Sequence, residues 1–163
     1  IIIISFIGVY QLYSSKITRF KKIPIFSKLF ISFNSLLLIL LGYYIFVGNN
    51  VLEVFPEDIS FIFLFGFTLA LNFIDIKDYK GDKLEKINTL PVLFGLKKSK
   101  IIIGIFFGIN YLIAFFILKK EFLLLPILLL ALIQFFLITR KNYDEKLVFI
   151  VYFISVFLFS YFY

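Results

Sequence analysis

The sequence consists of six long runs of Phe, Ile, Leu and other apolar residues, separated by short charged segments. The runs cover residues 1–12, 29–47, 59–74, 101–118, 122–139 and 147–163. All but the first come close to or exceed the roughly 17 residues that a helix needs to cross a bilayer. Apolar residues make up 62% of the chain, more than a soluble domain of 163 residues can bury. Because no period-two alternation is present, we predict an all-α, polytopic transmembrane bundle with about five full spans and one truncated span.

The first apolar run is too short to cross a bilayer. The chain opens with "IIIISFIGVY", without Met and without the charged leader that precedes the apolar core of a signal peptide. We therefore expect residues 1–163 to be the C-terminal portion of a single transmembrane domain whose N-terminal helices are missing.

Basic residues collect in alternate connecting segments, and the remaining segments carry few of them. They are Lys16, Arg19, Lys21, Lys22 and Lys28 after the first run, Lys77, Lys80, Lys83, Lys86, Lys97, Lys98 and Lys100 after the third, and Arg140, Lys141 and Lys146 after the fifth. Positive residues favour the cytoplasmic side, so these segments are predicted to face the cytoplasm of a multi-pass cell-membrane protein. The net charge of +7 then follows from topology and contact with anionic membrane lipids, and no nucleic-acid partner is expected.

The chain contains neither Cys nor His. Disulfides and thiolate metal sites are therefore excluded, and the usual general base and commonest metal ligand are absent. Any metal would have to be held by oxygen atoms, which suits a hard cation such as Mg²⁺.

Three aspartates follow the third apolar run at short intervals. If that helix continues beyond the membrane surface, Asp75, Asp78 and Asp82 fall within roughly 60° of one another, and Asn72 lies about 60° further round. Carboxylates on one stripe repel each other, so a positive partner is expected.

Two interpretations of this stripe are open. In the first it is an ordinary solvated segment in which nearby lysines neutralise the acids; these are Lys77, Lys80, Lys83 and Lys86. In the second, the D-x-x-x-D pair Asp78 and Asp82 holds Mg²⁺, the metal holds a phosphate ester, and the lysines attract the polyanion. Spacing alone does not decide between them.

The run "DIKDYKGDKLEKINTLPVLFG" resembles the second aspartate-rich motif of the UbiA family of membrane prenyltransferases, which reads D-x-x-D-x-x-G-D and then T-L-P-x-x-x-G. The matching residues are Asp75, Asp78, Gly81, Asp82, Thr89, Leu90, Pro91 and Gly95. A second stretch, "LYSSKITRFKKIP", is similar to the family segment in which a Tyr is followed by basic residues and a Pro. Tyr13 matches the Tyr, and its basic partner is Lys16, Arg19 or Lys22.

The resemblance covers the whole chain and corresponds to the end of the fourth helix through the ninth of a UbiA-like fold. It implies transfer of an isoprenyl group from a prenyl diphosphate to a small aromatic, quinone-type or lipid acceptor. It further implies catalysis by Asp78 and Asp82 and Mg²⁺ binding by Asp75, Asp78 and Asp82. The substrate-binding residues that it implies are Tyr13, Lys16, Arg19, Lys22, Asn72 and Lys83. The family's first aspartate-rich motif lies outside residues 1–163. We therefore expect these residues alone to be inactive as a prenyltransferase.

The alternative is a non-catalytic polytopic membrane protein, either a degenerate homologue or a transporter component. A transporter is expected to carry charges or broken helices at mid-membrane, whereas the acids here cluster at the boundary. The degenerate homologue stays open. For the polar residues within or near the spans, Asn34, Asn110 and Gln134, we favour interhelical hydrogen bonding.

Overall fold

A computed structural model describes residues 2–14, 23–47 and 54–163, and these residues form helices and no strands. The helices are α1 (Ile2–Ser14), α2 (Phe26–Val47), α4 (Glu57–Phe61), α5 (Phe67–Ala70), α6 (Ile74–Leu84), α7 (Leu90–Phe94), α8 (Leu96–Leu118), α9 (Leu124–Thr139) and α10 (Glu145–Phe162). A π-helical turn (Ile62–Gly66) joins α4 to α5, and 3-10 turns precede α6 (Leu71–Phe73) and α9 (Glu121–Leu123).

Five of these helical stretches are long and apolar enough to cross a membrane. They are Phe26–Val47, Glu57–Leu84, Leu96–Leu118, Glu121–Thr139 and Glu145–Phe162, whereas α1 is shorter. The all-α, polytopic architecture with five spans and one shorter helix is therefore confirmed. The main difference in bounds concerns Glu57–Leu84, called the third span below, which continues ten residues beyond the end of its apolar run at residue 74.

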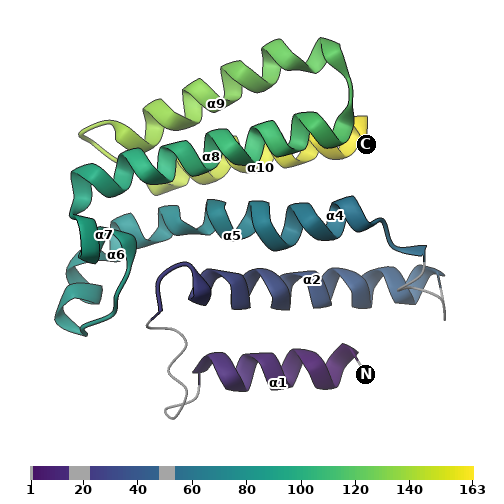
Figure 1. The fold of residues 1–163 in the computed structure, drawn as a ribbon, viewed down its shortest axis with the longest axis horizontal. Helices are drawn as coiled ribbons and strands as arrows, with labels where there is room; N and C mark the ends of the chain where they lie inside the picture. Colours follow the sequence, from purple (N-terminus) through teal and green to yellow (C-terminus); the bar gives the residue numbers. More distant parts are fainter. Residues whose placement is uncertain (1, 15–22, 48–53) are drawn as a thin grey trace.

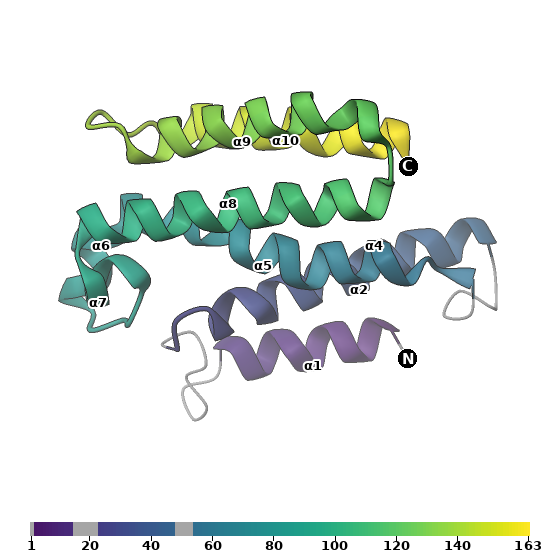
Figure 2. The same cartoon turned by 45° about the horizontal axis from the view of Figure 1, so that its top comes forward.

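The spans form an antiparallel bundle in which each contacts the next along the chain (Figure 1). In sequence order α1 packs on α2, α2 on the third span, the third span on α8, and α8 on α9. The turned view in Figure 2 shows α9 and α10 together on one side of α8, with α1 on the opposite side of the molecule. The helix ends next to the basic segments, including α6 and α7, lie at one end of the bundle, and both termini lie at the other (Figure 1).

The core is centred on α8, whose side chains Ile103, Phe107 and Tyr111 are almost completely buried. The outward faces are apolar as well; Phe46, for example, is 90% exposed. Large exposed apolar side chains are expected where lipid replaces water as the solvent. Gly104 permits the close packing of α8 on α9, because a methyl group there would overlap the ring of Phe135.

The third span is continuous but irregular. Its π-helical turn ends at Gly66, which packs so closely against α8 that a methyl group would overlap Oδ1 of Asn110. The Thr68 hydroxyl donates a hydrogen bond to the carbonyl of Leu64, within the same stretch. Such turns are uncommon in helices and often mark functional sites. They also change the direction in which residues beyond the turn project.

Candidate active site at the aspartate helix

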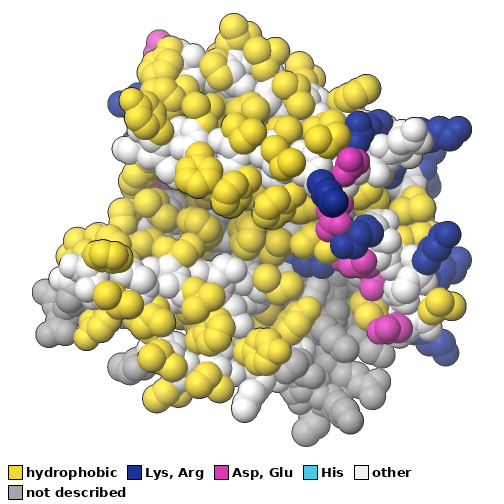
Figure 3. All heavy atoms as spheres, turned by 180° about the vertical axis from the view of Figure 1, so that it is seen from behind, with side chains coloured by type: hydrophobic (Ala, Val, Ile, Leu, Met, Phe, Trp, Pro, Cys, Tyr) yellow, Lys and Arg dark blue, Asp and Glu magenta, His cyan; other side chains and the backbone are white. Residues whose placement is uncertain are grey.

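The aspartate motif lies on α6, which continues the third span as a helix to Leu84. The three carboxylates share the predicted stripe but differ in environment: Asp75 is buried, Asp82 is half-buried and Asp78 is exposed. Figure 3 shows the rear face of the molecule, which is recessed in its middle, with acidic and basic side chains gathered at one end of the recess.

The buried Asp75 has a partner from another span. Lys28, in the first turn of α2, places its Nζ 2.5 Å from Oδ1 of Asp75, and the two side chains are only 12% and 7% exposed. This is the compensating positive charge that the stripe requires.

The lysines next to the aspartates form no ion pair with them in the described part of the chain. Among the described residues, the two ion pairs are Lys28–Asp75 and Lys77–Glu145, the latter joining α6 to α10 at 2.8 Å. The near-neighbour ion pairs of the first interpretation are not found among the described residues, although Lys77 lies close enough to Asp78 to interact with it electrostatically, so both interpretations stay open. The reason that Lys77 and Asp75 do not pair is geometric, since Lys77 projects towards α10 while Asp75 projects towards α2.

The other expected site residues lie in different settings. Tyr13, at the end of α1, is half-buried and close enough to Asp75 to interact with it electrostatically. Asn72 is fully buried; its Nδ2 donates to the carbonyls of Thr68 and Leu69, and its Oδ1 has no partner. Lys83 is exposed, with Nζ 5.9 Å from the ring centroid of Tyr79, a cation–π distance. Lys16, Arg19 and Lys22 lie outside the described residues.

The Thr-Leu-Pro segment of the motif folds back beside α6. The Thr89 hydroxyl is buried and lies near the Asp82 carboxylate. Ser99 of α8 fixes the next residue by donating to the carbonyl of Leu90 at 2.8 Å. Gly95 then joins α7 to α8 at a φ of +77°, which side-chain-bearing residues rarely adopt. The backbone conformation at this position therefore explains why the motif has a glycine at residue 95.

Tyr143, in the connection between α9 and α10, anchors the start of α6 and was not expected as a site residue. Its hydroxyl donates to the carbonyl of Phe73 at 2.8 Å, two residues before Asp75. Lys100 lies over its ring at 5.3 Å and donates to the carbonyl of Arg140. Burial raises the pKa of Tyr143 above its ordinary value, and the negative charges of Glu145 and Asp144 act in the same direction. Tyr143 therefore remains a protonated donor.

Neither Lys28 nor Tyr143 carried a signal that separates it from the other basic and aromatic residues near the spans. Lys28 was counted among the basic residues that set the topology, and Tyr143 lies in a short polar connection. A buried carboxylate predicts that some cation pairs with it, but only the packing of α2 on the third span shows which one.

The donor set of α6 can be compared with what a metal ion requires. Within the described ranges, no three acidic side chains converge closely enough to form a metal site of their own. With Asp75 paired to Lys28, Asp78 and Asp82 remain, one helical turn apart. Mg²⁺ typically takes one or two carboxylates and completes its octahedron with water and substrate phosphate. The arrangement fits that kind of open site.

Comparison with known proteins identifies one matching protein family. The model of the UbiA prenyltransferase family matches residues 1–163, which is the entire chain and includes α6 and the Thr-Leu-Pro segment. No curated protein and no solved structure matches the chain.

Proposed function

The chain belongs to the UbiA prenyltransferase family, and on this basis we propose that the protein transfers an isoprenyl group from a prenyl diphosphate to a small acceptor, with Asp78 and Asp82 as Mg²⁺ ligands. The observation that carries the proposal is the difference in burial and pairing among the three aspartates of α6. Asp75 is buried and paired with Lys28, while Asp78 and Asp82 remain accessible about one and two turns further on. A purely solvated segment does not require its first carboxylate to be buried against a lysine from another span.

When bound, Mg²⁺ would neutralise charge on the diphosphate and improve it as a leaving group. Asp78 and Asp82 would hold the metal, and Asp75 stands beside them with its charge balanced by Lys28. Lys83 and one or more of Lys16, Arg19 and Lys22 would attract and orient the polyanion. Tyr13, which interacts electrostatically with Asp75, and Asn72, whose Oδ1 is buried without a partner, are the further substrate-binding residues of this proposal.

The chemistry is a substitution at the allylic carbon. The C–O bond to the diphosphate breaks and its electron pair leaves with the diphosphate. A new bond then forms between that carbon and an electron-rich acceptor, which loses a proton if it is an aromatic ring. We propose an aromatic, quinone-type acceptor and place the aspartate end of the bundle on the cytoplasmic side of the cell membrane, in line with the basic segments gathered there.

The test uses the full-length protein in membranes, with a labelled prenyl diphosphate, Mg²⁺ and a panel of aromatic and lipid acceptors. We expect Asp78→Asn and Asp82→Asn each to lower transfer by on the order of 100-fold, because each removes charge that binds the metal. Glu85→Gln is the matched control, since it removes an exposed carboxylate next to the same helix.

Binding of Mn²⁺, followed by electron paramagnetic resonance, gives a second readout that does not depend on turnover. It should weaken in Asp78→Asn and Asp82→Asn but not in Glu85→Gln. Full activity and unchanged Mn²⁺ binding in both aspartate variants would show that the carboxylates are a solvated segment. Absence of transfer by the unmodified protein with every acceptor would favour the degenerate homologue.

A further inference from the structure

An open pocket of about 670 Å³ lies where the connection between α9 and α10 meets α6. Lys77 of α6, Arg140 of the connection and Lys146 of α10 contribute to its lining. The pocket is at the aspartate end of the bundle (Figure 1), on the side of α6 that faces α10, whereas Asp75 faces α2. None of the three aspartates of α6 lines it.

Two carboxylates also line the pocket, and both are engaged. Glu145 pairs with Lys77 at 2.8 Å, and Asp144 accepts a hydrogen bond from the backbone N–H of Lys146 at 2.9 Å as the N-cap of α10. Neither carboxylate forms an ion pair with Arg140 in the described part of the chain. Three basic side chains and two acidic ones line the pocket, so its charge is positive on balance.

The charge of Arg140 lacks compensation. Its Nε is buried and has no hydrogen-bond partner. Lys100, near the start of α8, donates from Nζ to the backbone carbonyl of Arg140 at 2.8 Å, and the two side-chain charges are close enough to repel each other. Two cations held near each other are stabilised by a bound anion. The geometry around Arg140 therefore favours an anionic ligand.

The connection lies at the membrane boundary because it joins two spans. The span Glu121–Thr139 ends one residue before Arg140, and Glu145–Phe162 begins five residues after it. Anionic lipid headgroups are present at this depth. On α9, Leu132 and Phe136 precede Arg140 at four-residue intervals, and both side chains are exposed. They provide an apolar surface for the acyl chains of a lipid whose headgroup lies in the pocket.

A phosphodiester fits the donors of this pocket. Its two non-ester oxygens share one negative charge, and a guanidinium can donate to both of them at once. Asn142, which also lines the pocket, has an amide that can donate to the phosphate or accept from a headgroup hydroxyl.

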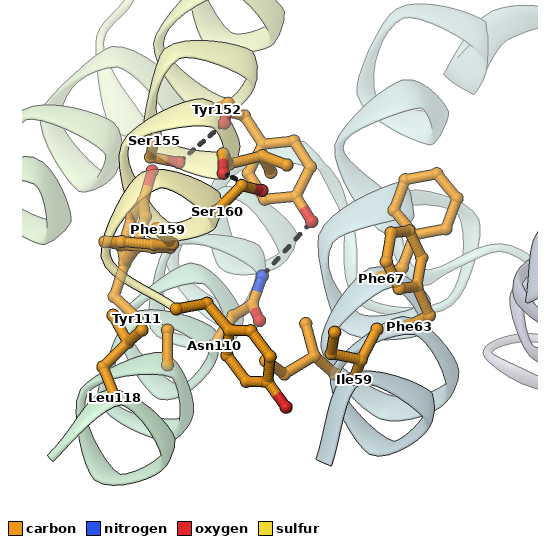
Figure 4. A pocket seen from close by; sticks show the side chains of 14 residues that line it. Ile59, Phe63, Phe67, Asn110, Tyr111, Leu118, Tyr152, Ser155, Phe159 and Ser160 are labelled. Carbon is orange, nitrogen blue, oxygen red and sulfur yellow. Dashed lines mark hydrogen bonds between the residues drawn. The ribbon is translucent and has the colours of Figure 1, made fainter. Parts of the chain in front are cut away.

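A second cavity, of about 270 Å³, has the opposite character (Figure 4). It lies between the third span, α8 and α10, and its lining includes Phe63, Phe67 and Phe159. The described residues that line it are uncharged. Because moving a phosphate charge into such surroundings is unfavourable without a counter-charge, an anionic headgroup is better placed in the pocket beside Arg140.

We infer that the pocket at the α9–α10 connection binds the phosphate of an anionic membrane phospholipid through the Arg140 guanidinium, with the acyl chains against the exposed face of α9. Lys146 and Asn142 are the further headgroup contacts. Because Tyr143 and Glu145 of the same segment hold the start of α6, a lipid bound here also strengthens the attachment of α6 to α10. Such binding does not require prenyl transfer.

The test titrates phosphatidylglycerol into the full-length protein in detergent micelles and counts bound lipid by native mass spectrometry. Phosphatidylglycerol should bind in preference to phosphatidylcholine, and Arg140→Gln should weaken its binding about tenfold or more, because a charge-assisted contact is lost. Arg140→Lys should restore only part of the affinity, since lysine keeps the charge but lacks the planar fork. Lys98→Gln is the matched control, because it removes an exposed charge at the same end of the bundle and outside the pocket.

Far-UV circular dichroism identifies variants that fail to fold. Equal binding of the two lipids by the unmodified protein, or equal losses in Arg140→Gln and Lys98→Gln, would overturn the inference. Inorganic phosphate and diphosphate are the competitors that distinguish a lipid from a free anion. If either displaces phosphatidylglycerol more than chloride does at the same ionic strength, the site takes a free phosphate group and the lipid assignment is wrong.

Amide hydrogen exchange of the unmodified protein in bilayer nanodiscs gives a readout that needs no variant. Replacing part of the phosphatidylcholine by phosphatidylglycerol should slow exchange in residues 140–146. Residues 119–123, which connect α8 to α9 at the other end of the bundle and also carry lysines, should be unaffected. Unchanged exchange in residues 140–146, or equal slowing in both connections, would refute a specific site beside Arg140.

Discussion

Breaking the ion pair between Lys28 and Asp75 should destabilise the bundle more than breaking an exposed ion pair does. Both side chains are nearly buried, at 12% and 7% exposure, and their charged atoms are 2.5 Å apart. Removing one partner of a buried pair leaves the other charge without compensation, at a typical cost of 3–5 kcal/mol. We expect Lys28→Gln to destabilise the protein by roughly 3 kcal/mol, near the lower limit because both residues lie near the end of the bundle.

The reverse substitution should cost less. In Asp75→Asn the remaining charge is on a long, flexible lysine whose ammonium group can move towards water, so a loss of about 1–2 kcal/mol is expected. The double variant should be more stable than the sum of the two single losses predicts, by about 1 kcal/mol or more, because the two residues are in direct contact. Lys77→Gln is the control, since its pair with Glu145 is much more exposed and should be worth no more than about 1 kcal/mol.

The assay is reversible unfolding in mixed micelles. Because the chain has neither Trp nor Cys, far-UV circular dichroism replaces indole fluorescence and thiol-reactive dyes as the probe. The reasoning would be refuted if Lys28→Gln cost no more than Lys77→Gln, or if the losses in the double variant were additive. Either result would mean that the pair is solvated in the membrane-bound protein.

Two further predictions concern the irregular third span. Tyr143→Phe leaves the carbonyl of Phe73 without its donor, so unfolding should become easier by about 1 kcal/mol and prenyl transfer should fall, whereas Tyr161→Phe at an exposed position should change neither. Gly66→Ala forces a methyl group onto Asn110 and should cost about 1–3 kcal/mol in the same unfolding assay, while Gly108→Ala, with open space around its Cβ, should be neutral or stabilising. Equal effects of the two glycine substitutions would contradict the close packing of the third span on α8.

The spans were predictable because each apolar run fixes a membrane helix almost independently of the others. The interhelical role favoured for Gln134 and Asn110 is also confirmed: Gln134 donates to the carbonyl of Val148 on α10, and Asn110 lies at hydrogen-bond distance from Tyr152. Asn34 differs, since its Oδ1 is buried without a partner. A polar residue in a membrane helix requires a partner, and this requirement is visible in a sequence even where the partner is not.

The connections around α6 could not be predicted in the same way. Lys28 and Asp75 are 47 residues apart, and Tyr143 and Phe73 are 70 apart, so each contact depends on which spans pack together. The π-helical turn could not be predicted either, because no proline lies within it; it ends at Gly66, which approaches α8 closely. Composition and spacing indicate that acids need compensation, but they favour sequence neighbours as the source.

Three side-chain contacts hold the beginning of α6, within its first turn and the residue before it. Tyr143 binds the carbonyl of Phe73, Lys28 pairs with Asp75 and Glu145 pairs with Lys77. Asp78 and Asp82 follow directly on the same helix, so their carboxylates project from a base that is fixed from two sides while remaining accessible themselves. A site that must bind a metal together with a diphosphate needs both properties, since loosely held ligands lose geometry and fully enclosed ligands exclude the substrate. If Asp78 and Asp82 hold the metal as proposed, the buried lysine and the tyrosine anchor are positioning residues for them, and neither is expected to touch the substrate.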